Sequence, residues 1–389
     1  MSKRALPIVI GIDLGSNNLR AVACVFDDSS KYPIIKATYK KEIEGMEKGN
    51  VVDPDEIGKE IEEAVFSLEE EVSGKTIHTF IAVGGSNLNS SQASGFTQVS
   101  RGDAEVTELD VENATKDGTR GVTDIRNKTV LHTIPIKYRL DGAEVTGDIL
   151  GMHGNKLEVK TLFVTYTNQY MKTLKEAISK SRIRITDIVS GPIAESIPLL
   201  TKKQRTSGVA LVNIGASVTS VLVYENNIPL LVSTISIGGN DITKDIALGL
   251  KVTTEEAEDI KCGTSDKPYN KRRVEEIVEA RIEDLSSKIN RELERIGRKE
   301  LLPSGIVVCG DVKETPKLDA MLKYELKLPI KIVSNELSKI TNEALSDNSF
   351  ARAYGLTLFA PNDNEKEIFK NLIASFFGRV KRFFIQFLP

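Results

Sequence analysis

Cysteine, histidine and long apolar runs are all scarce in this chain of 389 residues. The three cysteines are scattered and match no metal-binding spacing, and with three histidines no zinc site is predicted. Free cysteines in this number suit a reducing cytoplasm. No apolar run reaches the roughly 18 residues that a membrane-spanning helix needs. With 40% hydrophobic and 28% charged residues, the chain is predicted to be soluble and globular, with two or more domains.

Net charge is also small, at −3, which argues against general nucleic-acid binding. The charge is unevenly distributed. Residues 365–389 hold five basic and two acidic residues, a local balance of +3, which leaves −6 for the rest of the chain. Six of the 13 phenylalanines also fall in this C-terminal segment.

Two segments that lie 200 residues apart carry the same pattern. The residues "IGIDLGSNNLRAVACV" (10–25) align with "ALVNIGASVTSVLVYE" (210–225). Each copy predicts a strand of aliphatic residues, a turn that contains glycine, and a second strand. A third strand is predicted after each copy, near residues 33–41 and 228–237. Two unrelated hairpins are the alternative interpretation.

Amphipathic segments outside these two copies predict helices at 54–72, 168–181 and 272–297. The first begins at the pair Asp53-Pro54, a typical N-cap followed by a favourable first helical residue. Strands followed by crossing helices, twice over, predict an α/β protein with two similar halves. A ligand is then expected between the halves, at the ends of the strands.

Residues 86–166 do not fit the repeat and predict a small α+β insertion in the first half, where partner contacts are most easily added. The predicted boundaries are 1–85 with 167–200 for the first half, 86–166 for the insertion, 201–359 for the second half with an outer subdomain at about 242–300, 360–366 for a linker, and 367–389 for a C-terminal helix.

The two turns in the repeat have the composition of phosphate-binding loops. Successive backbone N–H groups at a turn bind phosphate, and glycine or serine allows its close approach. The sequence "DLGSNN" supplies such a turn, with its first residue, Asp13, placed to hold a hydrated Mg²⁺. The sequence "NIGASVT" offers the same backbone without the charge, because it begins with Asn213. A third segment, "GIVVCGD", predicts a buried strand that ends at Gly310, where a base or ribose could pass close to the backbone.

The C-terminal segment "EIFKNLIASFFGRVKRFFIQFLP" predicts an amphipathic helix with one broad apolar stripe and basic residues beside it. Aromatic anchors with basic flanks are typical of a helix that lies in a membrane interface, and the basic excess suits anionic lipids. The alternative is that the stripe packs on the protein's own core. The residues predicted to contact the membrane are Phe369, Leu372, Ile373, Phe376, Phe377, Arg379, Val380, Lys381, Arg382, Phe383, Phe384 and Phe387.

Several of these segments resemble the FtsA family of actin-like bacterial division proteins. The resemblance is carried by "VIGIDLGSNN", by "LHTIPIKYRLDG" with "GMHGNKLEVKTLFVT", by "GVALVNIGASVTS", by "SIGGNDITKDIALGL" with "EEAEDIKCG", and by the phenylalanine-rich tail. It covers essentially the whole chain, and the inserted segment is its most specific part. The resemblance implies an α/β actin-like ATPase fold with duplicated ribonuclease-H-like halves, the small α+β insertion and a C-terminal amphipathic helix.

The resemblance also implies a binding site for ATP and Mg²⁺. The two turns would flank the phosphates, Glu258 and Lys261 would reach the ribose and base, and Gly310 would lie below the adenine. A surface ion pair is the alternative interpretation of Glu258 and Lys261. The implied cofactor-binding residues are Asp13, which would hold Mg²⁺ through water, Gly15, Ser16, Asn17, Asn18, Asn213, Gly215, Ala216, Ser217, Thr219, Gly238, Gly239, Asp241, Glu258, Lys261 and Gly310.

Two departures from the family pattern predict a site that binds ATP with little or no hydrolysis. Where actin-like ATPases usually carry aspartate this chain has Asn213, and where they usually carry glutamate before a proline it has Gly191. The first loss removes an acid on the metal side, and the second removes the side chain expected to orient the attacking water. Together they are predicted to slow hydrolysis by several orders of magnitude, since each such group is worth roughly 10²–10⁴.

The family also implies the protein's partners and location. The chain would tether the tubulin-like division polymer FtsZ to the cytoplasmic face of the cell membrane at the division site, and it would form filaments. The C-terminal peptide of FtsZ would dock near the helix at 272–297, with Arg281 and Lys288 as contacts, because an acidic-to-apolar peptide needs a basic, exposed helix face. Later division proteins would bind through residues 86–166.

Two other functions stay open from the sequence. One is a platform protein of type IV pilus assembly resembling PilM, which would not need its own amphipathic tail. The other is a sugar or acetate kinase on the same fold, which would need a catalytic acid near the second turn. The tail and the insertion favour the FtsA family over the first, and Asn213 with Gly191 argues against the second.

Overall fold

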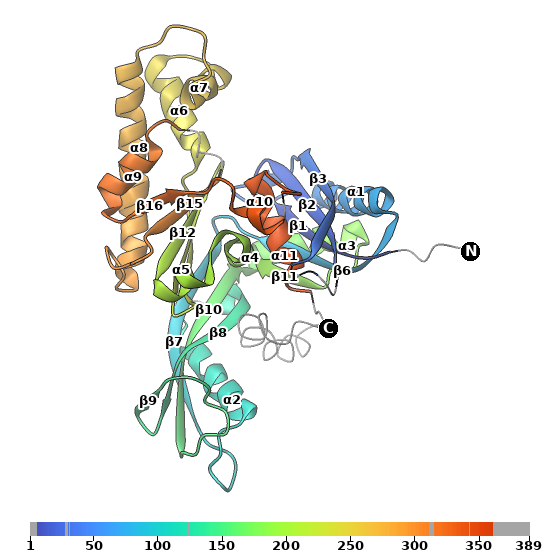
Figure 1. Cartoon of the computed structure of the whole chain (residues 1–389), viewed down its shortest axis with the longest axis vertical. Helices are drawn as coiled ribbons and strands as arrows, with labels where there is room; N and C mark the ends of the chain where they lie inside the picture. Colours follow the sequence, from blue (N-terminus) through green and yellow to red (C-terminus); the bar gives the residue numbers. More distant parts are fainter. Residues whose placement is uncertain are drawn as a thin grey trace, which may run out of the picture.

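Two five-stranded sheets with the same strand order form the two halves of the molecule (Figure 1). The computed structural model describes residues 6–27, 30, 32–122, 125–310, 315–341 and 343–360. The first sheet has the order β11-β6-β1-β2-β3, and its strands are β1 (Leu6–Leu14), β2 (Asn18–Val25), β3 (Ile34–Glu42), β6 (Gly74–Val83) and β11 (Asp187–Ser190). The second has the order β14-β13-β12-β15-β16, with strands β12 (Val209–Ile214), β13 (Thr219–Glu225), β14 (Ile228–Ile235), β15 (Ile306–Cys309) and β16 (Ile330–Ile332).

The predicted duplication is confirmed by this topology. In each sheet three consecutive strands form an antiparallel meander, and two further strands extend the sheet in parallel from the first of them. The register of the first hairpin is also repeated at the 200-residue offset, because Asp13 lies opposite Arg20 and Asn213 lies opposite Ser220.

Helices of the first half cover both faces of its sheet. The side chain of Asp53 accepts hydrogen bonds from the N–H groups of Asp55 and Glu56, which fixes the start of the first helix. That helix, α1, and helix α3 pack together on one face, and α4 and α11 pack together on the other side of β1. The elements are α1 (Pro54–Val72), α3 (Asn168–Ser181), α4 (Gly191–Leu199) and α11 (Ala351–Thr357), with the short strands β4 (Met46–Glu47) and β5 (Asn50–Val51) before α1.

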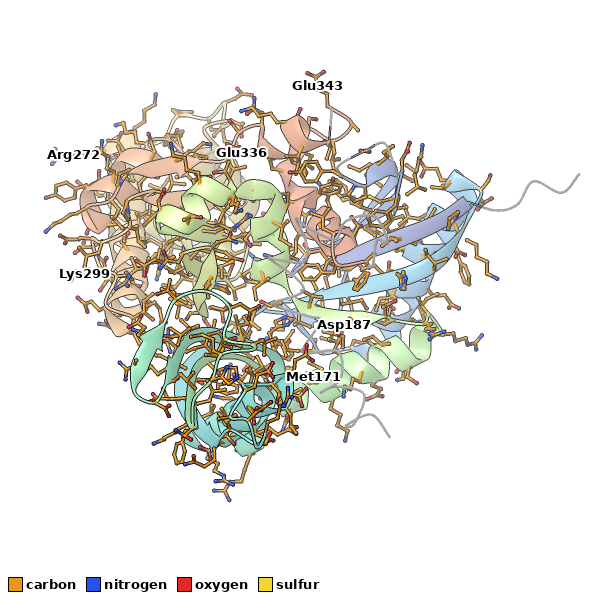
Figure 2. All side chains as sticks on the ribbon, turned by 60° about the horizontal axis from the view of Figure 1, so that its bottom comes forward. Met171, Asp187, Arg272, Lys299, Glu336 and Glu343 are labelled. Carbon is orange, nitrogen blue, oxygen red and sulfur yellow. The ribbon has the colours of Figure 1, made fainter. Side chains whose placement is uncertain are left out.

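In the second half, the helices α6, α7 and α8 form an outer layer at one end of the molecule (Figure 1). Figure 2 shows Arg272, at the start of α8, and Lys299, beyond its end, at the outer edge of this half. The opposite face of α8 is buried, which is why its apolar residues recur at helical spacing. The helices are α5 (Lys202–Ser207), α6 (Gly239–Leu250), α7 (Thr254–Cys262), α8 (Lys271–Arg295), α9 (Leu318–Leu326) and α10 (Glu336–Ile340).

Strand β12 lies between two hydrophobic cores. Its residues Val209 and Leu211 face the core shared with α4 and the first half, whereas Ala210, Val212 and Ile214 face the core under α6, α8 and α9. A strand buried on both faces reads as a continuous apolar run, and this accounts for the sequence "VALVNI".

The predicted α+β insertion is a separate four-stranded sheet at the other end of the molecule (Figure 1). Its strand order is β7-β10-β8-β9, and helix α2 packs on β7 and β10. Thr107 and Asp110 form a capping box that starts α2. The elements are β7 (Leu88–Gln98), α2 (Glu108–Gly118), β8 (Lys128–Leu140), β9 (Ala143–Val145) and β10 (Lys156–Thr167), with short 3₁₀ turns at Thr119–Gly121, Ile125–Asn127 and, after α10, Asn348–Phe350.

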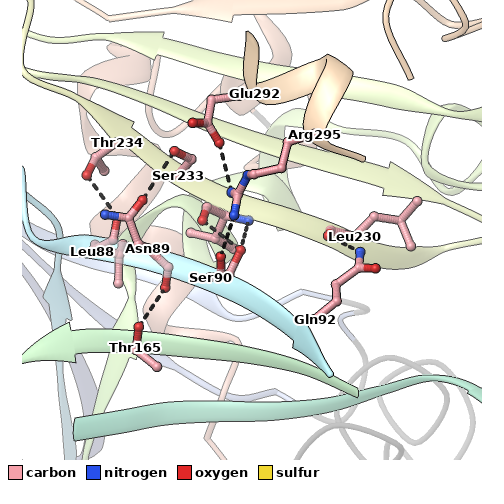
Figure 3. Close-up of polar contacts among 11 residues, drawn as sticks. Leu88, Asn89, Ser90, Gln92, Thr165, Leu230, Ser233, Thr234, Glu292 and Arg295 are labelled. Carbon is pink, nitrogen blue, oxygen red and sulfur yellow. Dashed lines mark hydrogen bonds and ion pairs between the residues drawn. The ribbon is translucent and has the colours of Figure 1, made fainter. Parts of the chain in front are cut away.

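Polar side chains join the insertion to the second half along strands β7 and β14 (Figure 3). The Ser90 hydroxyl donates to the carbonyl oxygen of Val232 and accepts from its N–H group, both at 2.8 Å. The Gln92 amide donates to the carbonyl oxygen of Leu230, also at 2.8 Å. The polar stretch "NLNSSQ" is therefore the edge strand of the insertion, and its polarity serves this contact.

None of the helices within the described ranges combines the length and the apolar character that a membrane crossing requires. The predicted membrane-binding helix at 367–389, and all of the predicted linker except Ala360, lie outside the described residues.

Candidate functional site

A cavity of about 330 Å³ lies between the two halves, where both hairpin turns face each other. Its wall contains most of the residues that the sequence assigned to the two turns. Those that line it are Asp13, Gly15, Ser16, Asn17, Asn18, Asn213, Gly215 and Ala216, and Gly310 lies beside them. The remaining predicted residues lie outside this wall.

Both turns close in the same way and leave backbone donors open. Gly15 N–H donates to the Asn18 carbonyl oxygen at 2.9 Å, and Gly215 N–H donates to that of Val218 at 3.0 Å. Within the described part of the chain, the N–H groups of Ser16, Asn17, Ala216 and Ser217 make no hydrogen bond. Successive free N–H groups in a turn are the donors that bind phosphate, so both turns keep the backbone chemistry that the sequence predicted.

Two basic side chains that sequence reasoning missed also line the cavity. Arg20 lies opposite Asp13 on the hairpin, and its Nε atom is buried without a partner among the described residues. Lys40 reaches the same wall from the neighbouring strand β3. The signal for Arg20 was its register, because residues opposite each other in an antiparallel pair point to the same face.

The centre of the cavity wall is a charged network built around Arg352 of α11. Its Nη1 donates to Asp13 Oδ1 at 3.3 Å, and its Nη2 donates to Glu195 Oε2 at 3.1 Å. The other Glu195 oxygen, Oε1, accepts from the Asn213 amide at 2.5 Å. Burial lowers the pKa of the Arg352 guanidinium, but the carboxylates of Asp13 and Glu195 outweigh burial and raise it above its ordinary value.

Neither Arg352 nor Glu195 was predicted from the sequence. The available signal was composition, because Arg352 is the only charged residue in the run "FARAYGLTLFA". A buried charge requires an opposite charge nearby, so the run predicts a partner without saying which one. Asp13 precedes Arg352 by 339 residues, and only the fold brings the two together.

The predicted residues Gly238, Gly239 and Asp241 support the second turn from behind. Gly239 N–H donates to the Gly215 carbonyl oxygen at 2.9 Å, and Gly238 N–H donates to the Asp241 carboxylate at 2.8 Å. A side chain at Gly238 would lie 2.4 Å from the Ala216 carbonyl oxygen, so this close approach requires glycine. These three residues therefore hold the turn in place, and they do not form the cavity wall.

Other predicted residues are occupied by local contacts. Lys261 is buried and lies 2.7 Å from Glu258, and it also donates to the Thr243 hydroxyl. The two residues form an ion pair, as in the alternative interpretation, but Lys261 is buried and not on the surface; neither member lines the cavity. The Thr219 hydroxyl donates to a backbone carbonyl at 2.8 Å, and Ser217 also lies outside the wall.

The two predicted partner contacts on α8 are paired with acids. Arg281 Nε lies 2.7 Å from Asp245, and Lys288 lies 2.9 Å from Asp284. Arg281 also lines a shallow groove between α6 and α8 that contains Leu248, whose side chain is 79% exposed. Lys288 is not part of that groove.

The residues beside Asp13 do not fit a divalent cation. Mg²⁺ prefers several oxygen ligands, usually one or two carboxylates with water. Here Arg352 holds both carboxylates, and the Asn213 amide turns its donor toward Glu195. Across the described ranges, no cluster of three or more His, Cys, Asp or Glu side chains could hold a metal ion.

Two halves of identical topology around a cleft define the actin-like ATPase fold, and solved structures agree. The PilM–PilN complex of type IV pilus biogenesis superposes with a TM-score of 0.66 at 18% identity, over 90% of this chain and 97% of that one. MreB5 of Spiroplasma citri bound to ADP superposes with a TM-score of 0.52 at 14% identity, over 95% of this chain and 98% of that one.

Sequence comparisons identify one family within this fold class. The family model "Cell division protein FtsA" matches residues 210–355, and the model "SHS2 domain inserted in FTSA" matches residues 85–165. FtsA of Bacillus subtilis is 27% identical over 84% of this chain and 78% of that protein, and FtsA of Escherichia coli K12 is 24% identical over 96% of each. The chain is a divergent member of the FtsA family of cell division proteins, as the resemblance in its sequence implied.

Proposed function

We propose that this chain is a nucleotide-binding actin-like scaffold of cell division, which binds ATP with little or no hydrolysis. The observation that carries the proposal is the pair of turns whose unbonded N–H groups at Ser16, Asn17 and Ala216 belong to residues that line one cavity. Arg20 and Lys40 line the same cavity. Two MreB5 structures of the same fold carry ADP and AMPPNP. Phosphates bound between the turns would meet backbone donors from both halves, so the nucleotide would hold the halves together.

Hydrolysis lacks a base in this arrangement. Gly191 has no side chain, and the Asn213 amide donates to Glu195. Glu195 itself is bound to Arg352 and Asn213, so it is not free to take a proton from water.

Titration with a fluorescent ATP analogue tests binding. Arg20→Gln removes a buried donor from the wall and is expected to weaken binding by about tenfold or more. Lys75→Gln, a change at an exposed position on β6, is the control and should leave affinity unchanged. Absence of saturable binding by the wild-type chain, or clear multiple turnover in a phosphate-release assay, would contradict the proposal.

For the FtsZ peptide we propose the groove between α6 and α8. It combines the exposed side chain of Leu248 and the half-buried Ile277 with Arg273 and Arg281, which suits a short peptide that is acidic and then apolar. The two arginines are paired with Glu276 and Asp245 of the same groove, so an acidic peptide would compete with these carboxylates. Lys288 drops out of this proposal because it lies outside the groove.

Anisotropy with a labelled FtsZ tail peptide tests the groove. Leu248→Asp places a charge on its apolar wall and is expected to weaken binding by about tenfold or more. Leu301→Asp is the matched control, because Leu301 is 63% exposed outside the groove. Equal affinities for the two variants would exclude this groove.

For the membrane we propose a peripheral position on the cytoplasmic face at the division site, through residues 367–389. Their apolar stripe and basic residues suit an anionic surface, where each basic residue adds about 1 kcal/mol. Deletion of 366–389 is expected to abolish sedimentation with anionic vesicles, and the full chain should carry FtsZ into the pellet. If the shortened chain still sedimented, the anchor would lie elsewhere.

Filament formation is the remaining part of the proposed function. Several membrane-bound subunits in one filament would raise avidity without any new contact. The insertion is the element proposed to contact the next subunit or later division proteins, because it projects from the end of the molecule (Figure 1). Electron microscopy on lipid monolayers, with Phe96→Asp as a variant at an exposed insertion residue and Leu301→Asp as control, tests this.

A PilM-like pilus platform is the alternative that a specific observation favours, because the PilM–PilN complex shares this fold over nearly the whole chain. The two FtsA family models and the FtsA relatives argue for division instead. The vesicle assay separates the two functions, since a PilM-like platform would not recruit FtsZ to lipid.

A further inference from the structure

We propose that Arg352 is a built-in cation that replaces the divalent metal ion in this cleft, so that nucleotide phosphates bind without Mg²⁺. The inference rests on the proposed nucleotide binding and concerns how the phosphate charge is neutralised. It reverses the sequence-based expectation that Asp13 holds a hydrated Mg²⁺.

The first support is the position of the guanidinium. It bridges Asp13 of the first half and Glu195 of α4, at 3.3 and 3.1 Å, and its side chain is only 16% exposed. Separating a buried charge from its partners is strongly unfavourable, so Arg352 is not expected to leave when solvent ions are present. A divalent cation beside Asp13 would meet this positive charge at close range.

The second support is the missing side chain at Gly191. A Cβ atom there would lie 2.8 Å from Arg352 Cδ and 2.9 Å from Arg352 Nε. Real Cβ contacts are not this short, so any side chain at this position would displace the arginine. The space that a side chain at position 191 would need is therefore filled by Arg352.

The third support is Asn213. Its amide donates to Glu195 Oε1, while Glu195 Oε2 accepts from Arg352. An aspartate at this position would set two carboxylates against each other. An amide at position 213 therefore suits the neighbouring carboxylate of Glu195. In the network of Asp13, Asn213, Glu195 and Arg352, each acceptor faces a donor without a metal ion.

The fourth support is an unused donor. The Nε atom of Arg352 is buried and has no hydrogen-bond partner among the described residues, although the side chain lines the cavity. A guanidinium matches phosphate oxygens with several donors in a fixed plane. Arg352 and Arg20 would then supply positive charge that Mg²⁺ otherwise brings to the phosphates, whereas Lys40 on the same wall is paired with Asp347 at 4.0 Å.

The first arm of the test uses the unmodified full chain. It is titrated with a fluorescent ATP analogue in excess Mg²⁺ and in excess EDTA. The expected dissociation constants differ by less than about threefold. A loss of about tenfold or more in EDTA would overturn the inference.

The second arm needs no nucleotide. Arg352→Gln leaves Asp13 and Glu195 facing each other without a cation, so added Mg²⁺ is expected to raise the Tm of this variant and to leave the wild-type Tm unchanged. Arg205→Gln is the matched control, because Arg205 is also a buried arginine but binds the Leu200 carbonyl and the Asn227 side chain. It should be destabilised without any response to Mg²⁺.

If Arg352→Gln does not fold, Glu195→Gln with Arg352→Gln removes one charge of each sign. This double variant is expected to bind the ATP analogue about tenfold more weakly in EDTA than in Mg²⁺, because Asp13 is then free to hold a metal ion. The same Mg²⁺ independence in the variants and the wild type would overturn the inference. If the wild type binds no nucleotide in either buffer, the proposed nucleotide binding is wrong. The Tm measurements with and without Mg²⁺ then test the role of Arg352 independently.

Discussion

The two hairpin turns of the cleft have the same backbone and opposite electrostatics. Each closes with one N–H to carbonyl bond at the same place in the repeat and leaves successive N–H groups free. In the first turn an acid, Asp13, is bound to a cation, whereas in the second an amide, Asn213, is bound to an acid. Duplication has preserved the donors that a phosphate needs and has not preserved the charges around them.

The difference in charge between the turns depends on two residues that belong to neither turn. Glu195 on α4 and Arg352 on α11 lie between Asn213 and Asp13 and complete the pairing on each side. The helices α4 and α11 pack against each other, so this link between the turns is part of the core. The free-energy effects of substitutions at the two turns are therefore expected to be non-additive.

The largest expected effect comes from making the second turn resemble the first. Asn213→Asp places a second carboxylate against Glu195 Oε1, where the Asn213 amide now donates at 2.5 Å. A buried charge without a partner costs about 3–5 kcal/mol, and the free energy of unfolding in urea should fall by that order. The control Asn226→Asp makes the same change on an exposed turn and should have little effect.

A second variant separates charge repulsion from simple loss of packing. Glu195→Gln with Asn213→Asp exchanges the amide and the carboxylate, so one donor again faces one acceptor. About half or more of the lost stability should return if repulsion is the cause. No recovery would show that the site does not depend on this complementarity.

The next effect concerns pH and distinguishes the halves, since residues 201–359 contain no histidine. His132, in the insertion, accepts a hydrogen bond at Nε2 from Ser190 N–H, directly before Gly191. Burial lowers the pKa of His132 from 6.5 to about 3. Between these values the unfolded chain binds a proton that the folded chain does not, so stability falls as pH falls, by about 1.4 kcal/mol per pH unit.

Urea denaturation at pH 7 and pH 4.5 measures this effect. The wild type should lose about 3 kcal/mol through His132 across that interval, in addition to the contribution of its carboxylates. His132→Gln keeps an acceptor and cannot take up the proton, so its loss should be smaller by that amount. Equal pH dependence of the two chains would show that His132 is not neutral in the fold.

The sequence predicted the parts of this fold that depend on local or repeated patterns. The 200-residue offset predicted both hairpins, and the Asp53 cap and helical spacing predicted α1 with its observed bounds, Pro54–Val72. The two similar halves and the insertion followed from the same patterns, and the actin-like class followed from the family resemblance. Strand β7 was obscured because its polar side chains bind the backbone of β14, a contact between distant segments.

The centre of the site could not be predicted for the same reason. Asn213 and Gly191 were recognised as departures, but the cause of each lies in another element. Glu195 explains the amide, and Arg352 explains the glycine. Pairings across 157 and 339 residues leave no spacing signal in one sequence.

A smaller effect is expected from Gly191→Ala, which tests the space that Arg352 occupies. The added Cβ would force the guanidinium to move from Asp13 and Glu195, at a cost of about 1–3 kcal/mol typical of overpacking. Gly102→Ala is the matched control, because a Cβ there meets nothing within 4 Å. A neutral Gly191→Ala in urea denaturation would mean that the arginine adjusts freely.

The smallest effect should come from exchanging the side chains of the turns themselves. Ser16→Ala with Ala216→Ser reverses the only serine-to-alanine difference between the paired loops while keeping every backbone N–H group. If backbone donors bind the phosphates, affinity for the ATP analogue should change by less than about twofold. Arg20→Gln is measured in parallel and shows how far affinity for the ATP analogue falls when a donor is removed from the cavity wall. A fall of about tenfold in the exchanged variant would instead assign the phosphate to the Ser16 hydroxyl, and the two turns would then differ in function as well as in charge.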